Sequence, residues 1–407
     1  MTPRRICLSC ALLIAVAAKA NAQNAPQDYP QWRGRNGDGS ASAFSPPSRW
    51  PDALTRRWRI EVGEGYATPL VVGDTVYVFT RRDGNEVVTA VDAGTGAVRW
   101  RSAYPSPYTP SSPTVAHGSG PKATPLFHEG KLFTVGINGV VSAFDAKGGK
   151  RLWQTDPPSE PPFFSAAASP VGAPGLVISH PGNYGPLTAF DASTGAVKWT
   201  AGAGGFFMSP LAVTLAGTSQ VVSVTQEGVI GVAPDDGTVL WKYPWSGGGM
   251  GGAMPIVYGE TVIVSASRNG ATAFKPIKRD EAWTVETVWQ TDDVSMYLSN
   301  PVVVGDALYG LSQRSSGEYF ALDAQTGKLL WFGPPRQATN TAVVKAGDLL
   351  FLLNDDGELI VAKASRTAFE PLKRYTVADN ATWAQPAISG KRIFVKDTSW
   401  LTLWTVD

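Results

Sequence analysis

The stretch Ala90-Val-Asp-Ala-Gly-Thr-Gly-Ala-Val-Arg-Trp100 occurs four times, with small changes, in this chain of 407 residues. The other copies span residues 143–153, 189–199 and 321–331. In the first copy, Asp92 can accept hydrogen bonds from backbone N–H groups two or three residues on, and Gly96 can adopt a positive φ. The stretch therefore predicts a tight β-hairpin whose second strand carries a large aromatic side chain.

A second element, a short apolar strand pair that usually opens with proline, precedes each hairpin. Its first copy is Thr68-Pro69-Leu-Val-Val-Gly-Asp-Thr-Val-Tyr77. The openings are spaced by about 40 to 56 residues, a period typical of four-stranded units. The others are at Pro125, Pro170, Pro210, Pro255, Pro301, Ala342 and Pro386. Because one four-stranded antiparallel sheet cannot cover both of its faces, the repeat predicts radial stacking into an all-β, eight-bladed propeller.

The last unit, after Pro386, has no hairpin-and-tryptophan strand of its own, whereas Arg57-Trp58-Arg59-Ile60 precedes the first unit without a partner. We expect this N-terminal strand to complete the last blade and close the ring, which removes an open sheet edge. The chain then divides into an N-terminal arm, residues 23–55, packed over the propeller by Trp32 and Trp50, and the propeller itself, residues 56–407.

One large aromatic residue in each outer strand is expected to dock its blade against the next. These residues are Trp58, Trp100, Trp153, Trp199, Trp241, Trp289 and Trp331, with Tyr375 in the remaining place. Their regular place in the repeat favours this structural role over a cofactor cage.

The N-terminus has the pattern of a secretory signal peptide. Two arginines precede an apolar run over residues 6–18, and small residues up to Ala22 offer a cleavage site. We expect residues 1–22 to be removed and the mature protein to be periplasmic or extracellular. Cys7 and Cys10 both lie inside this segment, and Cys10 comes too early in the run for lipidation. The mature chain therefore has no disulfide and no thiolate for chemistry.

The composition and net charge narrow the classes of protein to which the chain can belong. Hydrophobic residues make up 43% of the chain and charged residues 17%, which supplies a large core. The formal net charge of +1 argues against nucleic acid as the main partner. No segment after the signal peptide is apolar for long enough to span a membrane. We expect a monomer.

The loops that lead into the inner strands are unusual, because loop residues are normally polar and these carry aromatic and methionine side chains. In a propeller such loops converge at one end of the central channel. We call the following residues the collar and expect them to bind an envelope protein or a small apolar ligand. They are Tyr66, Phe164, Phe207, Met208, Met254, Met296, Tyr297 and Trp383. The alternative is that these side chains only plug the channel or pack under neighbouring loops.

Catalytic and metal-binding patterns are absent from the sequence. His117, His128 and His180 lie in different repeat units without metal-ligand spacing. No Gly-x-Ser-x-Gly motif is present, and isolated loop carboxylates do not define acid–base chemistry. The sequence therefore predicts no catalytic residue and no metal site.

The Ala-x-Asp-Ala-x-Thr-Gly-x-x-x-Trp copies resemble the tryptophan-docking repeats of the pyrroloquinoline-quinone (PQQ)-type propeller superfamily. This superfamily includes quinoprotein alcohol dehydrogenases and the outer-membrane assembly lipoprotein BamB. The resemblance implies the propeller fold, but the fold hosts more than one function. If the protein is similar to BamB in function as well as in fold, the resemblance implies an exported, non-catalytic binding scaffold of the cell envelope without a cofactor.

The alternative implied by the same resemblance is a PQQ-dependent quinoprotein dehydrogenase that oxidises an alcohol or sugar with quinone and calcium. Many such enzymes carry large insertions and an adjacent cysteine pair, and the mature chain has neither. Under this alternative Trp383 would stack on the quinone. Oxygen ligands would come from Asp293, Asn300, Asn340 or Asp379. Of the two hypotheses, we expect the binding scaffold and not the dehydrogenase.

Overall fold

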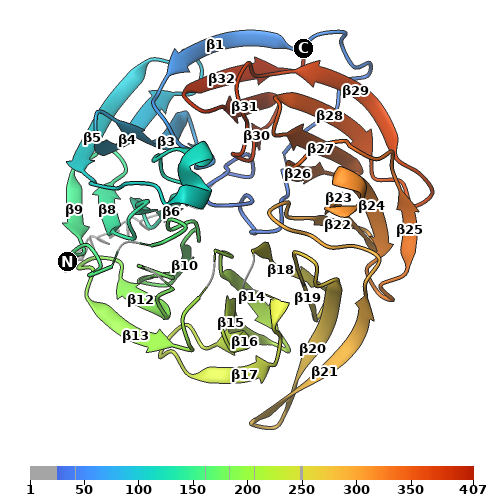
Figure 1. The fold of residues 1–407 in the computed structure, drawn as a ribbon. Coiled ribbons are helices and arrows are strands. Elements are labelled where there is room, and N and C mark those ends of the chain that lie inside the picture. The colour runs from blue at the N-terminus through green and yellow to red at the C-terminus, as the bar shows by residue number, and fades with distance from the viewer. Residues whose placement is uncertain (1–24, 42, 161, 183, 206, 248–250) are drawn as a thin grey trace, which may run out of the picture.

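The computed structural model describes residues 25–41, 43–160, 162–182, 184–205, 207–247 and 251–407, and the expected signal peptide lies outside these ranges. Eight four-stranded antiparallel sheets stand around a central channel, as Figure 1 shows. The expected all-β, eight-bladed propeller is confirmed. Among the described residues, none of the helices combines the length and apolar character needed to cross a bilayer.

In each of the first seven blades the strands follow chain order from the channel outward. Blade 1 contains β2 (Leu70–Val72), β3 (Thr75–Arg82), β4 (Asn85–Asp92) and β5 (Val98–Pro105). Blade 2 contains β6 (Leu126–His128), β7 (Lys131–Val135), β8 (Val141–Asp145) and β9 (Arg151–Gln154). Blade 3 contains β10 (Val171–Ala173), β11 (Leu176–Ser179), β12 (Leu187–Asp191) and β13 (Val197–Ala201). Blade 4 contains β14 (Leu211–Leu215), β15 (Thr218–Thr225), β16 (Gly228–Val232) and β17 (Val239–Tyr243).

The second half of the ring continues this order. Blade 5 contains β18 (Gly252–Tyr258), β19 (Thr261–Ala266), β20 (Ala271–Arg279) and β21 (Ala282–Thr291). Blade 6 contains β22 (Val302–Val304), β23 (Ala307–Ser312), β24 (Glu318–Asp323) and β25 (Leu329–Phe332). Blade 7 contains β26 (Thr341–Ala346), β27 (Leu349–Asn354), β28 (Glu358–Lys363) and β29 (Glu370–Thr376). Short 3-10 helices, η1 (Ser112–His117) and η3 (Arg314–Ser316), lie in connecting loops.

Blade 8 is built from both ends of the chain. It contains β30 (Ala387–Ser389), β31 (Arg392–Lys396) and β32 (Trp400–Thr405), and its outer strand is β1 (Thr55–Glu61). β1 pairs antiparallel with β32, and Trp58 lies opposite Leu403. Ring closure by this pairing leaves the sheet of blade 8 as wide as the other seven.

The repeated hairpin turn is held by its aspartate. In blade 1, Asp92 Oδ1 accepts hydrogen bonds from the N–H groups of Gly94 at 3.1 Å and Thr95 at 2.9 Å. Gly96 follows with φ +76°, a value that an L-side chain adopts only under strain. The turn directs the outer strand back along the blade. Gly96, which has no side chain, then faces the outer strand of the preceding blade.

The outer-strand tryptophans lie against this turn in the next blade. A Cβ on Gly96, Gly149, Gly195, Gly237 or Gly327 would begin 2.4 to 2.9 Å from the indole of the preceding blade. Five of the indoles also donate Nε1–H to a carbonyl of that turn region. These bonds run from Trp58 to Ala93, Trp153 to Ala192, Trp199 to Pro234, Trp289 to Ala324 and Trp331 to Ser365, at 2.9 to 3.3 Å.

Trp241 departs from this arrangement. Its indole lies across Gly231 of its own blade and donates Nε1–H to Gln220. Strand pairing places Gly231 opposite Trp241, a position filled by alanine in other blades, as Ala189 is opposite Trp199. The missing methyl group makes room for the ring, and blade 5 supplies no glycine turn for it to cover. Trp241 still packs on Phe274 of blade 5, with ring centroids 5.8 Å apart.

The N-terminal arm enters the central channel rather than lying over the propeller. Figure 1 shows it in blue, crossing the middle of the ring. Tyr29 exchanges two backbone hydrogen bonds with Val71 of the inner strand β2. Ala41 and Gly39 bond to Lys345 of the inner strand β26, on another side of the channel. Farther along, Trp50 packs outside the channel against Phe351, with ring centroids 6.2 Å apart.

Arg33 anchors the arm in the channel. Its side chain is only 1% exposed, and its Nη2 donates to the Pro301 carbonyl at 2.6 Å. Burial lowers the pKa of Arg33 to about 10. Asp38 lies within the same segment and pairs with Lys345 Nζ at 2.9 Å. The channel is therefore filled by a charged, hydrogen-bonded segment and not by the collar.

Candidate functional site at the mouth of the channel

The loops that lead into the eight inner strands lie on one face of the ring, which we call the mouth face. A belt of hydrogen bonds runs around most of the channel just inside it. In five junctions between blades, a backbone N–H at the start of an inner strand donates to the side chain at the same place in the next blade. The pairs are Gln385 to Thr68, Thr68 to Thr124, Thr124 to Ser169, Ser169 to Ser209 and Met254 to Asn300, at 2.8 to 3.1 Å.

One aromatic cluster stands on the mouth face over blades 8, 1 and 2. The ring of His117, at the end of η1, meets Trp383 edge to face at 4.7 Å and lies 6.5 Å from Tyr66. Figure 1 shows η1 in teal beside the centre of the ring. The Tyr66 N–H donates to the Pro121 carbonyl at 2.9 Å, which holds the η1 loop against blade 1. Burial lowers the pKa of nearby Lys122 to about 8.

A second aromatic cluster covers blades 3 and 4. Phe164 meets Phe163 at 4.8 Å and Phe207 at 5.3 Å, both edge to face. Phe207 also meets Tyr184 at 6.1 Å. Phe163 is 52% exposed, so the cluster presents an apolar surface to solvent. The two clusters bring together Tyr66 with Trp383, and Phe164 with Phe207. Tyr297 lies apart on the loop before blade 6, and no ring contact joins it to either cluster among the described residues.

The three methionines of the collar are not part of an accessible surface, and that expectation was wrong. Met208, Met254 and Met296 are 2%, 3% and 0% exposed. Met208 packs with the core between blades 4 and 5, and Met296 with the core between blades 5 and 6. Blades diverge outward from the channel, and a flexible thioether fills the wedge left at the start of an inner strand. A place near the start of an inner strand therefore does not keep these side chains exposed to solvent.

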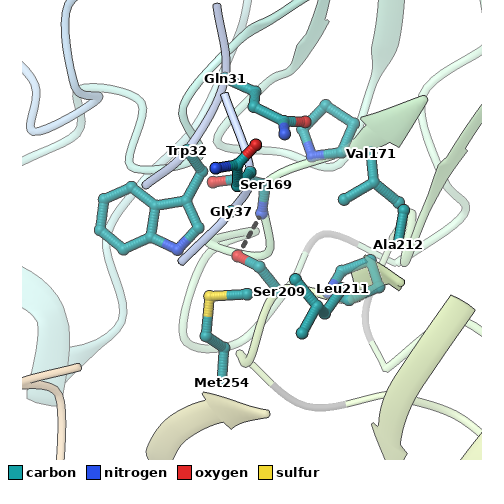
Figure 2. A pocket seen from close by; sticks show the side chains of 12 residues that line it. Gln31, Trp32, Gly37, Ser169, Val171, Ser209, Leu211, Ala212 and Met254 are labelled. Atoms are coloured by element: carbon teal, nitrogen blue, oxygen red, sulfur yellow. Dashed lines mark hydrogen bonds between the residues drawn. The ribbon is translucent and has the colours of Figure 1, made fainter. Parts of the chain in front are cut away.

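Met254 is buried where the arm meets the inner strands. It lines a small pocket of about 20 Å³ together with arm residues Gln31 and Trp32. Figure 2 shows Trp32 beside Ser169, Ser209 and Met254, so the arm meets residues of the belt at this pocket. This pocket is too small for a cofactor, because sites for small molecules measure roughly 300–1,000 Å³.

The oxygen atoms considered for calcium are already used inside the protein. Asn300 Oδ1 accepts from Met254 N–H, and Asn340 Oδ1 accepts from the Ser299 hydroxyl. Asp379 pairs with Arg59 at 2.8 Å. The described part of the chain brings no three His, Cys, Asp or Glu side chains together in a metal-binding group. The fourth residue, Asp293, accepts from the Thr291 hydroxyl at 3.2 Å, so calcium would have to displace existing bonds at all four residues. His117 packs against Trp383, the residue expected to stack on the quinone.

Fold and repeat define the class of protein: an eight-bladed propeller of PQQ-like repeats, with an arm in its channel and aromatic loops at its mouth. The family model described as "Outer membrane protein assembly factor BamB" matches residues 52–135, 83–332 and 286–407, and the chain belongs to this family. A BamB of Shewanella oneidensis is 28% identical over 258 residues, which cover 58% of this chain and 62% of that protein. The match thus spans less than two thirds of this relative.

Two solved structures have the same fold. BamB from Moraxella catarrhalis aligns with a TM-score of 0.64 at 17% identity, covering 87% of this chain and 98% of that one. Quinohemoprotein alcohol dehydrogenase from Comamonas testosteroni aligns with a TM-score of 0.65 at 16% identity, covering 95% and 82%. At these identities the likeness concerns the fold alone, and an enzyme and an assembly factor share it almost equally.

Sequence reasoning missed two features of the site. The belt was hidden because hydroxyls before the inner strands were noted only as strand openings. A Thr or Ser before proline at four successive openings, from Thr68 to Ser209, was the available signal. The η1 loop places His117 between Tyr66 and Trp383, residues far apart in sequence, and no pattern in the chain announces that contact.

Proposed function

We propose that the mature protein is an exported, non-catalytic scaffold of the cell envelope that holds a partner protein against the loops of its mouth face. One observation carries this proposal. Half of the large apolar side chains that the described structure leaves exposed lie in mouth-face loops: Val115, Phe163, Tyr297 and Leu298. The others, Val98, Leu152, Val197 and Val288, sit singly on outer strands of different blades. The mouth-face residues form two groups, Val115 and Phe163 before blades 2 and 3, and Tyr297 and Leu298 before blade 6. Apolar side chains concentrated on one face indicate an interaction surface, whereas single ones on separate outer strands do not.

The chemistry of the partner follows from the family. Relatives are named as outer membrane protein assembly factors, so the partner we propose is a protein of the outer-membrane assembly machinery. The aromatic clusters supply large contact area at low conformational cost, as anchors of protein interfaces do. The scaffold acts as a monomer in this proposal, with the buried methionines only filling space between blades.

The test places a photo-crosslinking amino acid at four positions in the producing cell. Phe163 and Tyr297 report on the mouth face, and Val98 and Leu152 on the outer strands serve as matched exposed controls. We expect adducts with a component of outer-membrane protein assembly from the two mouth positions only. Adducts of equal yield from all four positions, or from none, contradict the proposal.

A separate measurement addresses the quinoprotein alternative. Purified mature protein is mixed with PQQ and calcium, and both the quinone absorbance and dye-linked alcohol oxidation are followed. Saturable, stoichiometric binding accompanied by turnover would show an enzyme and overturn the scaffold.

A further inference from the structure

A second hollow on the mouth face lies away from the channel, between the outer parts of blades 4 and 5. It has a volume of about 410 Å³, against about 20 Å³ for the channel pocket. This volume falls within the roughly 300–1,000 Å³ of small-molecule sites. The residues that argue for a ligand here are Trp245, Ser246, Asn269, Thr272, Gln290 and Asp292.

Strand pairing and alternation explain how the wall forms. Thr272 lies directly opposite Gln290 on the β20–β21 pair, so both side chains project from the same face of the sheet. Phe274, two residues after Thr272, packs into the core shared with blade 4, which identifies this face as the one toward blade 4. Across the hollow, Tyr243 at the end of β17 is fixed by stacking on Phe274 at 4.1 Å.

The rim brings an indole, an amide and a carboxylate together. A Cβ on Gly247 would begin 2.3 Å from Asn269 Nδ2 and 2.4 Å from Trp245 Cζ2, so the amide and the indole flank this glycine closely. A Cβ on Gly270 would begin 2.8 Å from Asp292 Oδ1. The carboxylate therefore lies beside the same turn that carries Asn269.

The polar groups of this wall have no partners inside the protein. Among the described residues, the side chains of Asn269, Thr272, Gln290 and Asp292 make no hydrogen bond or ion pair. Thr272 is only 5% exposed, and its hydroxyl nevertheless has no acceptor or donor beside it. Buried hydroxyls without a partner also occur at Thr89, Thr134 and Ser179, but those atoms are fully enclosed, whereas Thr272 lines the open hollow. The Thr272 hydroxyl and the exposed side chains of Asn269, Gln290 and Asp292 are therefore all available to hydrogen-bond a molecule in the hollow.

These groups specify the class of ligand. The lining offers amides and hydroxyls, which donate and accept, and one carboxylate, which accepts. It contains no Lys, Arg or His, so it does not favour an anion. A half-buried indole supplies a flat apolar surface. A neutral sugar matches all three features, because its hydroxyls both donate and accept while the C–H face of its ring is apolar.

We propose that this hollow, defined by Trp245, Asn269, Thr272, Gln290 and Asp292, binds a neutral hexose or a hexose disaccharide. The sugar ring packs on Trp245, and its hydroxyls bond to the amides and to the Asp292 carboxylate. This site is separate from the channel mouth and does not depend on the partner proposed there.

The test uses the full mature protein and three probes: D-glucose, N-acetylglucosamine and maltose. Binding is followed by isothermal titration calorimetry and by saturation-transfer NMR. We expect saturable binding of at least one sugar, weakened about tenfold by Gln290→Ala and by Asp292→Asn, since each removes one hydrogen-bonding group. Gln325→Ala in an exposed turn and Asp280→Asn at the β20–β21 hairpin tip are matched controls and should leave binding unchanged.

Melting temperatures of the four variants should match that of the unaltered protein, because these side chains are exposed. Three results overturn the proposal: no saturable binding of any of the three sugars, binding that survives both pocket substitutions, or equal binding of cyclohexanol. The last would show an apolar hollow without recognition of hydroxyls.

Discussion

Docking of Trp199 on the turn of blade 4 leads to a quantitative prediction about stability. The indole is 8% exposed, donates to the Pro234 carbonyl at 2.9 Å and covers Gly237. Trp199→Ala removes this contact and should lower the free energy of unfolding by about 3–5 kcal/mol.

Gly237→Ala perturbs the same contact from the other side. The backbone there has φ +78°, which costs an alanine roughly 1–2 kcal/mol. The added methyl would also begin 2.7 Å from Trp199 Cδ2, and such overpacking costs roughly 1–3 kcal/mol. In the double variant the indole is gone, so only the backbone cost remains. The double variant should therefore lose about 1–3 kcal/mol less than the sum of the two single losses.

The assay is urea unfolding followed by circular dichroism, with Gly217→Ala as the control. Gly217 lies in the same blade with φ +71° and has nothing within 4 Å of an added Cβ. The loss of unfolding free energy caused by Gly217→Ala should add to the loss caused by Trp199→Ala. Two results would refute docking of this indole on the turn. One is that the losses from Gly237→Ala and Trp199→Ala add fully in the double variant, and the other is a loss below about 1 kcal/mol for Trp199→Ala alone.

Three further predictions concern the closure, the belt and a buried histidine. A chain lacking residues 1–61 should melt at a lower temperature than one lacking residues 1–54, because only the shorter chain loses β1 and leaves β32 unpaired; equal melting temperatures refute closure by β1. Ser169→Ala strands the buried Thr124 N–H and should cost about 1–3 kcal/mol in urea unfolding, whereas Ser169→Thr keeps the hydroxyl and most of the stability; equal losses contradict the belt. Burial lowers the pKa of His180 to about 4, so the unfolded chain takes up this proton first and stability present above pH 6.5 is lost as the pH falls toward 4. The unaltered protein should lose about 3 kcal/mol more than His180→Gln between pH 7 and pH 4, and parallel unfolding profiles would contradict this.

The propeller was predictable because its blades repeat a local signal. Each hairpin needs an aspartate, a turn glycine and an outer tryptophan within eleven residues, and Asp92, Gly96 and Trp100 show the pattern plainly. The exception at Trp241 also had a signal. Gly231 replaces alanine opposite it, and the unit ending at Trp289 lacks the glycine turn on which Trp241 would lie.

The interior of the channel was not predictable in the same way. Arg33 is a charged residue in a loop-like segment, and charged residues are rarely buried without partners. Its burial depends on a carbonyl at Pro301, 268 residues away, and no local pattern encodes that distance. The collar methionines failed for a related reason. Whether Met208 or Met296 faces solvent depends on how far neighbouring blades diverge, which is a property of the whole ring.

The closing pair of blade 8 sets an order of events for a chain made from its N-terminus. Among the described strands, β1 is synthesised first, and its only partner in the sheet, β32, comes after all the others. Tyr29 likewise waits for Gln385, to which its hydroxyl donates at 2.8 Å. Blades 1 to 7 can form as their own strands appear, but the ring cannot. A chain interrupted before Trp400 lacks β32, the strand between β1 and β31, so the ring closes only after the strands of all eight blades have been made.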